Sequence, residues 1–566
     1  MEQPTKKTIR HMIRHSVETF SDHPALSWAD STPITYRQLG EEIKGITLLL
    51  HKQGIVTGDK VAILGENSPN WGIAYLAVTS MGAVAVPILP DFHPSEIQHI
   101  LNHSGSKAIF ISLKLFHKIE AAIFDQLKTM ILIDDFRLIP PETDSEKLKN
   151  LLREGERELA RWKDSALKLA GFLPSEVEED SLAAIIYTSG TTGHSKGVML
   201  THKNLITNTI STLAIQDCSP ADRLISILPL SHTYENTLGF LLPIMSGAAI
   251  YYLDKPPTSR VLLPAMQKIR PTMMLTVPLI IEKIFKTKIH PTFTHNPVLN
   301  FYYKMPPFRK FLHRIAGRKL LKSFGGKLRF FGIGGALLSA EVERFLRDAG
   351  FPYAIGYGLT ETSPLIAGCS PKLTRYRSTG PVIPGVQVRI DNPDPVSGEG
   401  EILVKGDNVM QGYYNNPERT AEVMTEDGWF RTGDLGILKK SGYLYIKGRL
   451  KNMILGPSGE NIYPEEIEAQ INENDYILES IVYAEDNKII ARCYLNYELL
   501  DVEFKRKHLK DHQAREAIDQ LLESVRKEVN EQRAAYSRLS RIIEQTEPFE
   551  KTPTKKIKRY LYIPDQ

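Results

Sequence analysis

Short apolar runs alternate with longer amphipathic stretches through the first part of the chain. Residues 60–64, 83–89, 108–112 and 130–134 are rich in apolar residues and are bounded by turns, which predicts buried strands. Between them, stretches such as residues 35–54 carry apolar residues three and four positions apart and predict amphipathic helices. Strands that alternate with helices indicate a mainly parallel α/β sheet.

The alternation continues beyond this region. Further strands are expected at residues 181–187, 223–230 and 328–333, and two short strands with a long helix are expected in the last hundred residues. Residues 141–170 are charged, with apolar residues at helical spacing, and predict a helix. Packing on the surface of the domain is the simpler interpretation of this helix, and partner binding is the alternative.

The size and charge of the chain narrow the class of protein. A chain of 566 residues is too long for one compact core, so two or more domains are expected. The net charge of +4 gives no reason to expect nucleic acid as the main partner. Cys218, Cys369 and Cys493 show no metal-binding or redox spacing, and a reduced, cytoplasmic setting is the simplest fit.

No membrane-spanning segment is expected. The longest apolar-rich run, residues 240–253, is interrupted by Pro243 and Gly247 and falls short of the ~20 residues of a transmembrane helix. The N-terminus lacks the apolar core of a signal peptide. These patterns leave peripheral contact with the inner face of a membrane open.

A loop of small polar residues follows the apolar run 181–187. Residues 188–195, TSGTTGHS, carry little side-chain bulk, and Lys196 and Gly197 come next. Small residues let backbone N–H groups close around an anion, while hydroxyls and a lysine add donors and charge. The residues predicted to bind phosphate are Thr188, Ser189, Gly190, Thr191, Thr192, Gly193 and Lys196.

This loop differs from the P-loop, in which Ser or Thr follows the lysine. Gly197 stands at that position, and a second candidate, GGKL at residues 325–328, lacks the hydroxyl as well. A merely flexible Ser/Thr/Gly loop is the alternative interpretation, which the preceding strand and the lysine disfavour.

Three later segments have features that suit a nucleotide. The glycines at 334–335 permit close approach of the backbone to a flat ligand, although a plain tight turn is a fair alternative. In the segment 357–361, YGLTE, the ring can stack on a base, and the hydroxyl and carboxylate can hold phosphate and Mg²⁺. Asp434, in a glycine-flanked turn, suits a ribose diol or serves the turn itself.

Two segments between these motifs have features that suit an acid substrate. His232 follows the predicted strand 223–230, at the end of a strand where α/β sheets place ligands. Residues 273–280 are largely apolar; they line a tunnel or, as residue types alone favour, form ordinary core.

Taken in order, these motifs resemble those of the adenylate-forming (AMP-binding) superfamily, which includes acyl-CoA synthetases, nonribosomal adenylation domains and luciferases. Residues 187–197 are similar to YTSGTTGxPKG, with Ser195 in place of proline, and the segments 357–361 and 428–434 are similar to YGxTE and GWxxTGD. Residues 271–289 and 550–562 resemble long-chain acyl-CoA synthetases in particular.

The resemblance implies a role for each motif. For the nucleotide, it implies that adenine is bound by Gly334, Gly335, Ala336, Tyr357 and Gly358, ribose by Asp434 and Arg449, phosphate by Thr360 and the loop, and Mg²⁺ by Thr188 and Glu361. It implies that Gly459 faces CoA and that Lys556 lies at the reacting carboxylate. For His232 it implies either orientation of the carboxylate or shaping of the acyl pocket. The C-terminal segment departs from the family pattern at Glu550 and Lys555, where proline and glycine are usual. On charge alone, this basic tail suits a nucleic acid or a membrane.

The fold that the resemblance implies is a large α/β domain, residues 1–448, and a small mobile α+β domain, residues 449–566, with a hinge near Lys451. The implied activity is ATP-dependent conversion of a fatty acid to an acyl adenylate, followed by transfer to CoA. The alternatives are loading of an acyl carrier protein, ligation of an aromatic or short-chain acid, and a nucleotide-binding protein without activity.

Overall fold

The alternation of strands and helices is present in the computed structural model. It describes residues 6–120, 124, 126–140, 143–144, 148, 176–188, 195–294, 296–455, 461–486, 488–506, 511–552 and 556–563. Most of the amphipathic stretch 141–170 lies outside these ranges, as do the loop residues 189–194, Gly459 and Lys555.

Two large sheets form the N-terminal part. An eight-stranded sheet has the order β20-β9-β8-β4-β3-β5-β6-β7, and its central pairs, from β8 to β6, are parallel. Its strands are β3 (Lys60–Leu64), β4 (Val84–Ile88), β5 (Ala108–Ile111), β6 (Thr129–Leu132), β7 (Leu138–Ile139), β8 (Leu182–Thr188), β9 (Lys196–Thr201) and β20 (Gly412–Tyr413).

The second sheet has seven strands in the order β14-β13-β12-β10-β11-β1-β2, and all its pairs except β1–β2 are parallel. Its strands are β1 (Pro24–Trp28), β2 (Ile34–Thr35), β10 (Arg223–Ile225), β11 (Ala249–Tyr252), β12 (Met273–Thr276), β13 (Phe330–Ile333) and β14 (Tyr353–Ile355). The predicted strand 223–230 is shorter than expected and ends at Ile225. Beyond it, Ser226, Leu228 and Leu230 form hydrogen bonds with the Asn67 side chain.

Helices between the two sheets create one large core. The helix α3 (Pro69–Ser80) begins at the Ser68 cap and has buried residues around its whole circumference, from Trp71 to Thr79. Trp71 and Tyr75 stack at 5.4 Å, and both rings pack edge-on against Phe240 of the π-helix η2 (Tyr234–Leu241). The helices α1 (Ile9–Thr19), α2 (Tyr36–Lys52) and α7 (His202–Leu213) contribute buried faces to the same core.

A third sheet leads to the C-terminal part. It is antiparallel, with the order β17-β22-β21-β19-β18, and comprises β17 (Gly380–Pro381), β18 (Val386–Asp391), β19 (Gly400–Gly406), β21 (Phe430–Leu438) and β22 (Tyr443–Arg449). Beyond it, β25 (Ile477–Glu485), β26 (Lys488–Leu495) and β27 (Leu539–Gln545) form a small sheet.

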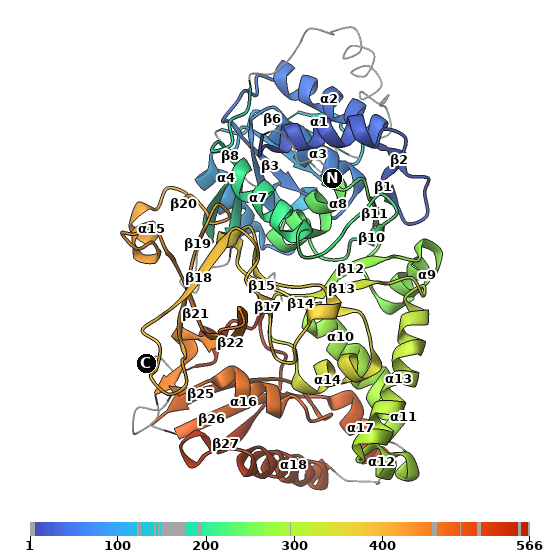
Figure 1. Ribbon diagram of the computed structural model, residues 1–566, viewed down its shortest axis with the longest axis vertical. Coiled ribbons are helices and arrows are strands. Elements are labelled where there is room, and N and C mark those ends of the chain that lie inside the picture. The colour runs from blue at the N-terminus through green and yellow to red at the C-terminus, as the bar shows by residue number, and fades with distance from the viewer. Residues whose placement is uncertain are drawn as a thin grey trace.

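Helices and a separate apolar core complete this C-terminal unit. Its helices are α16 (Pro464–Ile471), α17 (Tyr497–Arg506) and α18 (Asp511–Glu531), and its buried residues form their own cluster. Figure 1 shows this unit at the end of the molecule opposite the helices α1 and α2. Mainly parallel sheets followed by a small α+β unit confirm the predicted fold class.

Candidate active site

The glycine turn 334–336 follows β13, one of the parallel strands. Gly335 has a φ of +90°, which favours glycine, and both Gly335 and Ala336 are exposed. A Cβ atom on Gly334 would lie 3.1 Å from the ring of Tyr234, so the turn rests directly on that ring. The turn thus presents bare backbone to solvent on one side and is supported by an aromatic ring on the other.

The segment YGLTE follows β14 as the short strand β15 (Tyr357–Gly358) and the 3-10 turn η4 (Thr360–Thr362). A Cβ atom on Gly358 would come within 1.8 Å of the backbone oxygen of Pro364, so no side chain fits there. The Tyr357 hydroxyl donates to Asp434 Oδ2 at 2.8 Å, and Asp434 Oδ1 lies 3.0 Å from Arg449 Nε. The structure therefore brings together three residues from separate motifs.

This ion pair is partly withdrawn from water. Burial raises the pKa of the Asp434 carboxyl, and Arg449 and Tyr357 oppose that rise. Asp434 in turn raises the pKa of Arg449. The arrangement presents a hydrogen-bonded carboxylate beside a guanidinium, groups that suit a diol and a phosphate respectively.

Glu361 lies beside the lysine of the predicted phosphate loop. The Tyr413 hydroxyl donates to Glu361 Oε1 at 2.9 Å, and the Lys196 ammonium lies 5.2 Å from the centroid of the Tyr413 ring. Burial and Arg419 lower the pKa of Lys196, while Glu361 raises it. Lys196 is the cross-strand partner of Thr188, so these two residues lie side by side where the predicted loop leaves and rejoins the sheet.

The region around Glu361, Tyr413 and Lys196 suits a nucleotide bound with Mg²⁺. No group of three or more His, Cys, Asp or Glu side chains that could hold a metal is found within the described ranges. Mg²⁺ at nucleotide sites needs only one or two carboxylates, because water and phosphate oxygens supply the remaining ligands. Glu361 is one such carboxylate, and Thr188, the cross-strand partner of Lys196, carries a hydroxyl of the kind that adds a further oxygen ligand. Thr360 lies close by, with its Oγ1 accepting from Thr233 Oγ1 at 3.4 Å.

His232 lies in the turn between β10 and η2. Its Nδ1 accepts a hydrogen bond from the backbone N–H of Tyr234 at 3.2 Å, which leaves the proton on Nε2. Burial, with a contribution from Lys556, lowers the pKa of His232 to about 4. The imidazole is therefore neutral near pH 7 and offers Nε2–H as a donor.

Lys556 reaches the site from the C-terminal unit. Burial and the charge of Arg449 lower its pKa, while Asp434 and Glu361 raise it. The residue as a whole remains exposed to solvent. Nearby, Arg559 fixes the segment to the C-terminal unit, 2.7 Å from Glu468 and donating to the Val482 carbonyl at 2.7 Å. Lys556 is thus brought to the site, and the adjacent Lys555 lies outside the described residues.

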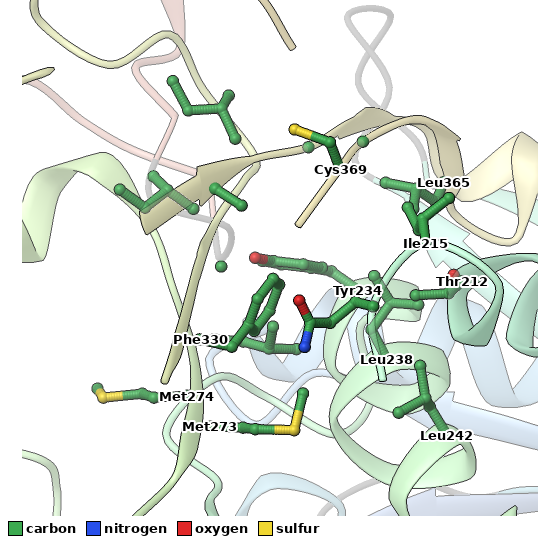
Figure 2. Close-up of a pocket in the computed structure, with 18 of the residues that line it drawn as sticks. Thr212, Ile215, Tyr234, Leu238, Leu242, Met273, Met274, Phe330, Leu365 and Cys369 are labelled. Carbon is green, nitrogen blue, oxygen red and sulfur yellow. The ribbon is translucent and has the colours of Figure 1, made fainter. Parts of the chain in front are cut away.

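An apolar pocket adjoins the glycine turn (Figure 2). Gly332 and Ile333, which line it, directly precede Gly334, and Gly356 directly precedes Tyr357. Figure 2 shows Tyr234 near its middle, with Cys369 above and Met273 and Met274 below. The remaining lining residues come mainly from α7, η2, β12, β13 and β14, and residues 273–275 are both buried core and pocket wall.

Several residues of this region were not assigned a function from sequence. Tyr413 holds Glu361, Thr233 contacts Thr360, and Tyr234 lines the pocket and packs against the glycine turn. Tyr234 lies within the PLSHTYE segment, so proximity to His232 was an available signal. Tyr413 offered no comparable signal, because it reaches the site through the pairing of β20 with β9.

A second contact joins the C-terminal unit to the large part of the chain. Lys286 Nζ donates to the backbone carbonyls of Asn472, Asn474 and Ile477, the last at 3.3 Å. Next to it, His290 lies 3.4 Å from Asp475 and 3.6 Å from Glu341. Although burial lowers the pKa of His290, the two carboxylates raise it overall. In this arrangement the C-terminal unit is held where Lys556 faces Asp434 and Glu361.

Fold and site together define an adenylate-forming enzyme. The chain belongs to the family of AMP-binding enzymes, whose family model matches residues 13–414. It is 28% identical over 532 residues to the long-chain-fatty-acid–CoA ligase heimdall of Drosophila melanogaster, covering 85% of this chain and 75% of that protein. It is 29% identical over 517 residues to long-chain-fatty-acid–CoA ligase 5 of Rattus norvegicus, covering 85% and 74%.

Solved structures show the same fold. O-succinylbenzoate coenzyme A synthetase from Bacillus subtilis, in complex with AMP, superimposes with a TM-score of 0.73 at 22% identity, covering 100% of this chain and 99% of that one. These comparisons confirm the predicted superfamily and the predicted class, an AMP-forming acid–thiol ligase. No helix of the described residues is both long and apolar enough to cross a membrane.

Proposed function

We propose that the protein is a long-chain fatty-acid–CoA ligase. The observation that carries this proposal is the apolar pocket beside the glycine turn, with Tyr234 lining the pocket and packing against Gly334. An acid whose chain enters the pocket presents its carboxylate toward the glycine turn and Tyr357, which directly follows the lining residue Gly356. The names of the relatives, long-chain-fatty-acid–CoA ligases among them, support the same substrate class.

The first step joins two anions. The carboxylate attacks the α-phosphate of ATP, forming the acyl adenylate and releasing pyrophosphate. In this proposal, Lys556 neutralises both reactants, which is the main electrostatic requirement of such a step. His232 donates Nε2–H toward the acid, because its low pKa keeps it neutral. No side-chain nucleophile is needed, and positioning does much of the remaining work.

The remaining groups bind the nucleotide. We propose that Asp434 and Arg449 hold the ribose and that Tyr357, with the glycine turn, holds the adenine. Thr188, Thr360, Lys196 and the loop residues 189–193 hold the phosphates. Thr188 and Glu361 hold Mg²⁺, which supplies positive charge to the phosphate oxygens when bound.

The second step is thioester formation, in which the thiol of CoA attacks the adenylate and AMP leaves. Lys556 lies beside Asp434 and Glu361 in the present arrangement, where the thiol has to approach. We therefore propose that the small domain, residues 449–566, rotates about Lys451 away from residues 1–448. Gly459 then lies beside CoA.

An acyl carrier protein is the alternative acceptor. One relative, from Arabidopsis thaliana, is named as a long-chain-fatty-acid–[acyl-carrier-protein] ligase.

The location of the protein is part of the proposal. We propose a cytoplasmic setting, which agrees with three cysteines that are free and buried, and peripheral contact at the inner face of a membrane. A long-chain acid is itself an amphiphile, so contact with a membrane would bring the enzyme to its substrate.

The test is pyrophosphate release with ATP and Mg²⁺ against carboxylates of two to eighteen carbons, with and without CoA. Release that peaks with long chains, with thioester formed, is expected. Release that peaks with short or aromatic acids would overturn the substrate class. Release that needs a carrier protein in place of CoA would overturn the acceptor.

A further inference from the structure

One exposed surface takes no part in the proposed site. It lies on α12 (Pro297–Tyr303) and α13 (Pro306–Ser323), in the connection between β12 and β13 (Figure 1). Eight of the 22 large apolar side chains that are exposed among the described residues fall between positions 298 and 315. They include Phe301 and Phe311, exposed by 62% and 61%. We call these eight the apolar ridge: Val298, Leu299, Phe301, Tyr302, Met305, Phe308, Phe311 and Ile315.

The ridge is continuous across the two helices. The rings of Phe301 and Tyr302 lie 5.6 Å apart, and those of Tyr302 and Phe308 lie 5.1 Å apart. Phe308, Phe311 and Ile315 follow at i, i+3 and i+7, so they share one face of α13. Aromatic side chains of α12 thus extend the apolar face of α13.

The opposite face of α13 anchors the ridge to the core. His313, Gly317 and Leu320 are buried there. His313 Nε2 lies 3.0 Å from the Tyr303 hydroxyl, and its Nδ1 lies 3.1 Å from Asp348. The helix α13 is therefore apolar on two faces, and core packing explains only one of them.

The segment that carries the ridge is strongly basic. Residues 296–328 contain eight Lys or Arg residues and no Asp or Glu, in a chain whose net charge is only +4. These are Lys304, Arg309, Lys310, Arg314, Arg318, Lys319, Lys322 and Lys327. Within the described part of the chain, none of the eight has an ion pair recorded. Lys319 and Lys322 continue the face of Phe308, Phe311 and Ile315 toward the C-terminus of α13.

We propose that this surface docks on a bilayer that contains anionic lipids. Exposed aromatic and aliphatic side chains enter the boundary between headgroups and acyl chains, while basic side chains remain at the level of the lipid phosphates. An acidic protein is a weaker fit, because protein interfaces are depleted in lysine relative to the rest of the surface and this face is rich in it. An apolar patch of this extent on a single chain marks an interaction site.

The position of the ridge in the fold indicates how docking would serve the proposed ligase. The strands β12 and β13, which the ridge-bearing connection joins, both line the apolar pocket. When the protein is docked, these strands and the pocket that they line lie near fatty acids dissolved in the bilayer. Vesicle binding does not rest on the proposed ligase activity, although its benefit to the enzyme does.

The experiment is co-sedimentation of the full-length protein with vesicles of phosphatidylcholine, with or without about one third phosphatidylglycerol. Binding to the mixed vesicles is expected, weakening as salt rises. The variant Phe301→Ser/Phe308→Ser/Phe311→Ser should bind at least about tenfold more weakly, because three insertions are lost. Its control, Val56→Ser/Leu373→Ser/Val502→Ser, removes three apolar side chains exposed elsewhere and should bind like the wild type.

A charge variant tests the electrostatic part. Arg318→Gln/Lys319→Gln/Lys322→Gln should lose most of the preference for phosphatidylglycerol, at least about tenfold. Lys44→Gln/Lys440→Gln/Lys488→Gln, which removes three exposed lysines at other places, should keep that preference. Thermal unfolding of each variant verifies that it is folded.

Three results would overturn the proposal. They are the absence of wild-type binding to mixed vesicles, equal binding by the serine variant, and association with a purified acidic acyl carrier protein in place of vesicles. Turnover of a water-soluble short acid is measured alongside. Vesicle binding without turnover of any acid would refute the ligase and leave the docking intact, and turnover without vesicle binding would do the reverse.

Discussion

Asp434 and Arg449 are direct cross-strand partners in the β21–β22 ladder, and their side chains meet at 3.0 Å in the candidate site. The ladder therefore fixes the separation of the two charges before any ligand arrives. Asp434→Asn removes the carboxylate and leaves Arg449 without its partner. The expected result is a fall in kcat/KM for ATP of about tenfold to a hundredfold, since one charged hydrogen bond is lost. The KM for CoA should change little.

Asp391→Asn is the matched control for this variant. It removes a carboxylate from the same sheet, 3.2 Å from Arg431, away from the candidate site. Steady-state kinetics with ATP as the varied substrate would show whether kcat/KM differs between Asp434→Asn and Asp391→Asn. An equal loss in both variants would mean that Asp434 acts through the stability of the sheet alone.

Lys556 is expected to serve only the first half-reaction. Lys556→Ala should slow pyrophosphate release by about a hundredfold to a thousandfold, because one charge that stabilises the meeting of two anions is removed. Thioester formation from supplied acyl adenylate should persist. Lys558→Ala is the control, since Lys558 lies 3.5 Å from Glu550 and is not among the charges that act on Asp434. Equal loss of both half-reactions in Lys556→Ala would refute this division.

Glu235 should make stability depend on pH. It is buried in η2, accepts from Ser226 Oγ at 2.6 Å, and burial raises its pKa to about 8. A carboxyl that titrates near 4.5 when unfolded and near 8 when folded binds more protons in the folded state between these values. Stability from this group is therefore complete below about pH 4.5 and declines up to about pH 8.

Glu235→Gln removes that titration while keeping the shape of the side chain. The melting temperature of the variant should fall less than that of the wild type between pH 6 and pH 8, with a difference in unfolding free energy of about 2–4 kcal/mol at the upper end. Differential scanning calorimetry across this range is the measurement. Parallel curves for the two proteins would contradict the assignment.

Lys286 is expected to favour the arrangement that serves adenylation. Lys286→Met removes its donors to three carbonyls of the C-terminal unit while keeping most of its apolar stem. Pyrophosphate release should slow by about tenfold, because charged hydrogen bonds hold the two parts together. Thioester formation from supplied acyl adenylate should be unchanged or faster. Lys283→Met, one turn earlier and exposed, is the control, and an equal effect on both steps would contradict the proposal.

Much of the fold follows from local pattern. The strands at residues 60–64, 84–88 and 108–111 are continuous apolar runs, as expected of parallel strands buried on both faces. The strand β27 was not predicted, because its exposed and half-buried residues after Leu539 carry little apolar signal. The strand β27 is set by its pairing with β26, a contact between segments distant in sequence that a short stretch of sequence does not reveal.

The candidate site likewise combines residues that local motifs predict with residues that only tertiary packing brings in. Tyr357, Glu361 and Asp434 were expected because their motifs are short and contiguous, and the structure brings them together. Tyr413 was not expected, because its contact with Glu361 spans 52 positions of sequence. The contact of Lys286 with the C-terminal unit spans 186 positions or more. Such contacts depend on tertiary packing, which no motif encodes.

The contact of Lys286 with the C-terminal unit decides which sequence changes residues 472–477 tolerate. Its acceptors are backbone carbonyls, and every residue type supplies one. The Lys286 hydrogen bonds therefore tolerate side-chain changes at Asn472 and Asn474, whereas inserting or deleting one residue would displace the carbonyls. Apart from Asp475, which pairs with His290, and the buried Ile477, the turn is constrained more in length than in composition. In laboratory evolution, point substitutions at its other positions should persist and changes of length should be eliminated.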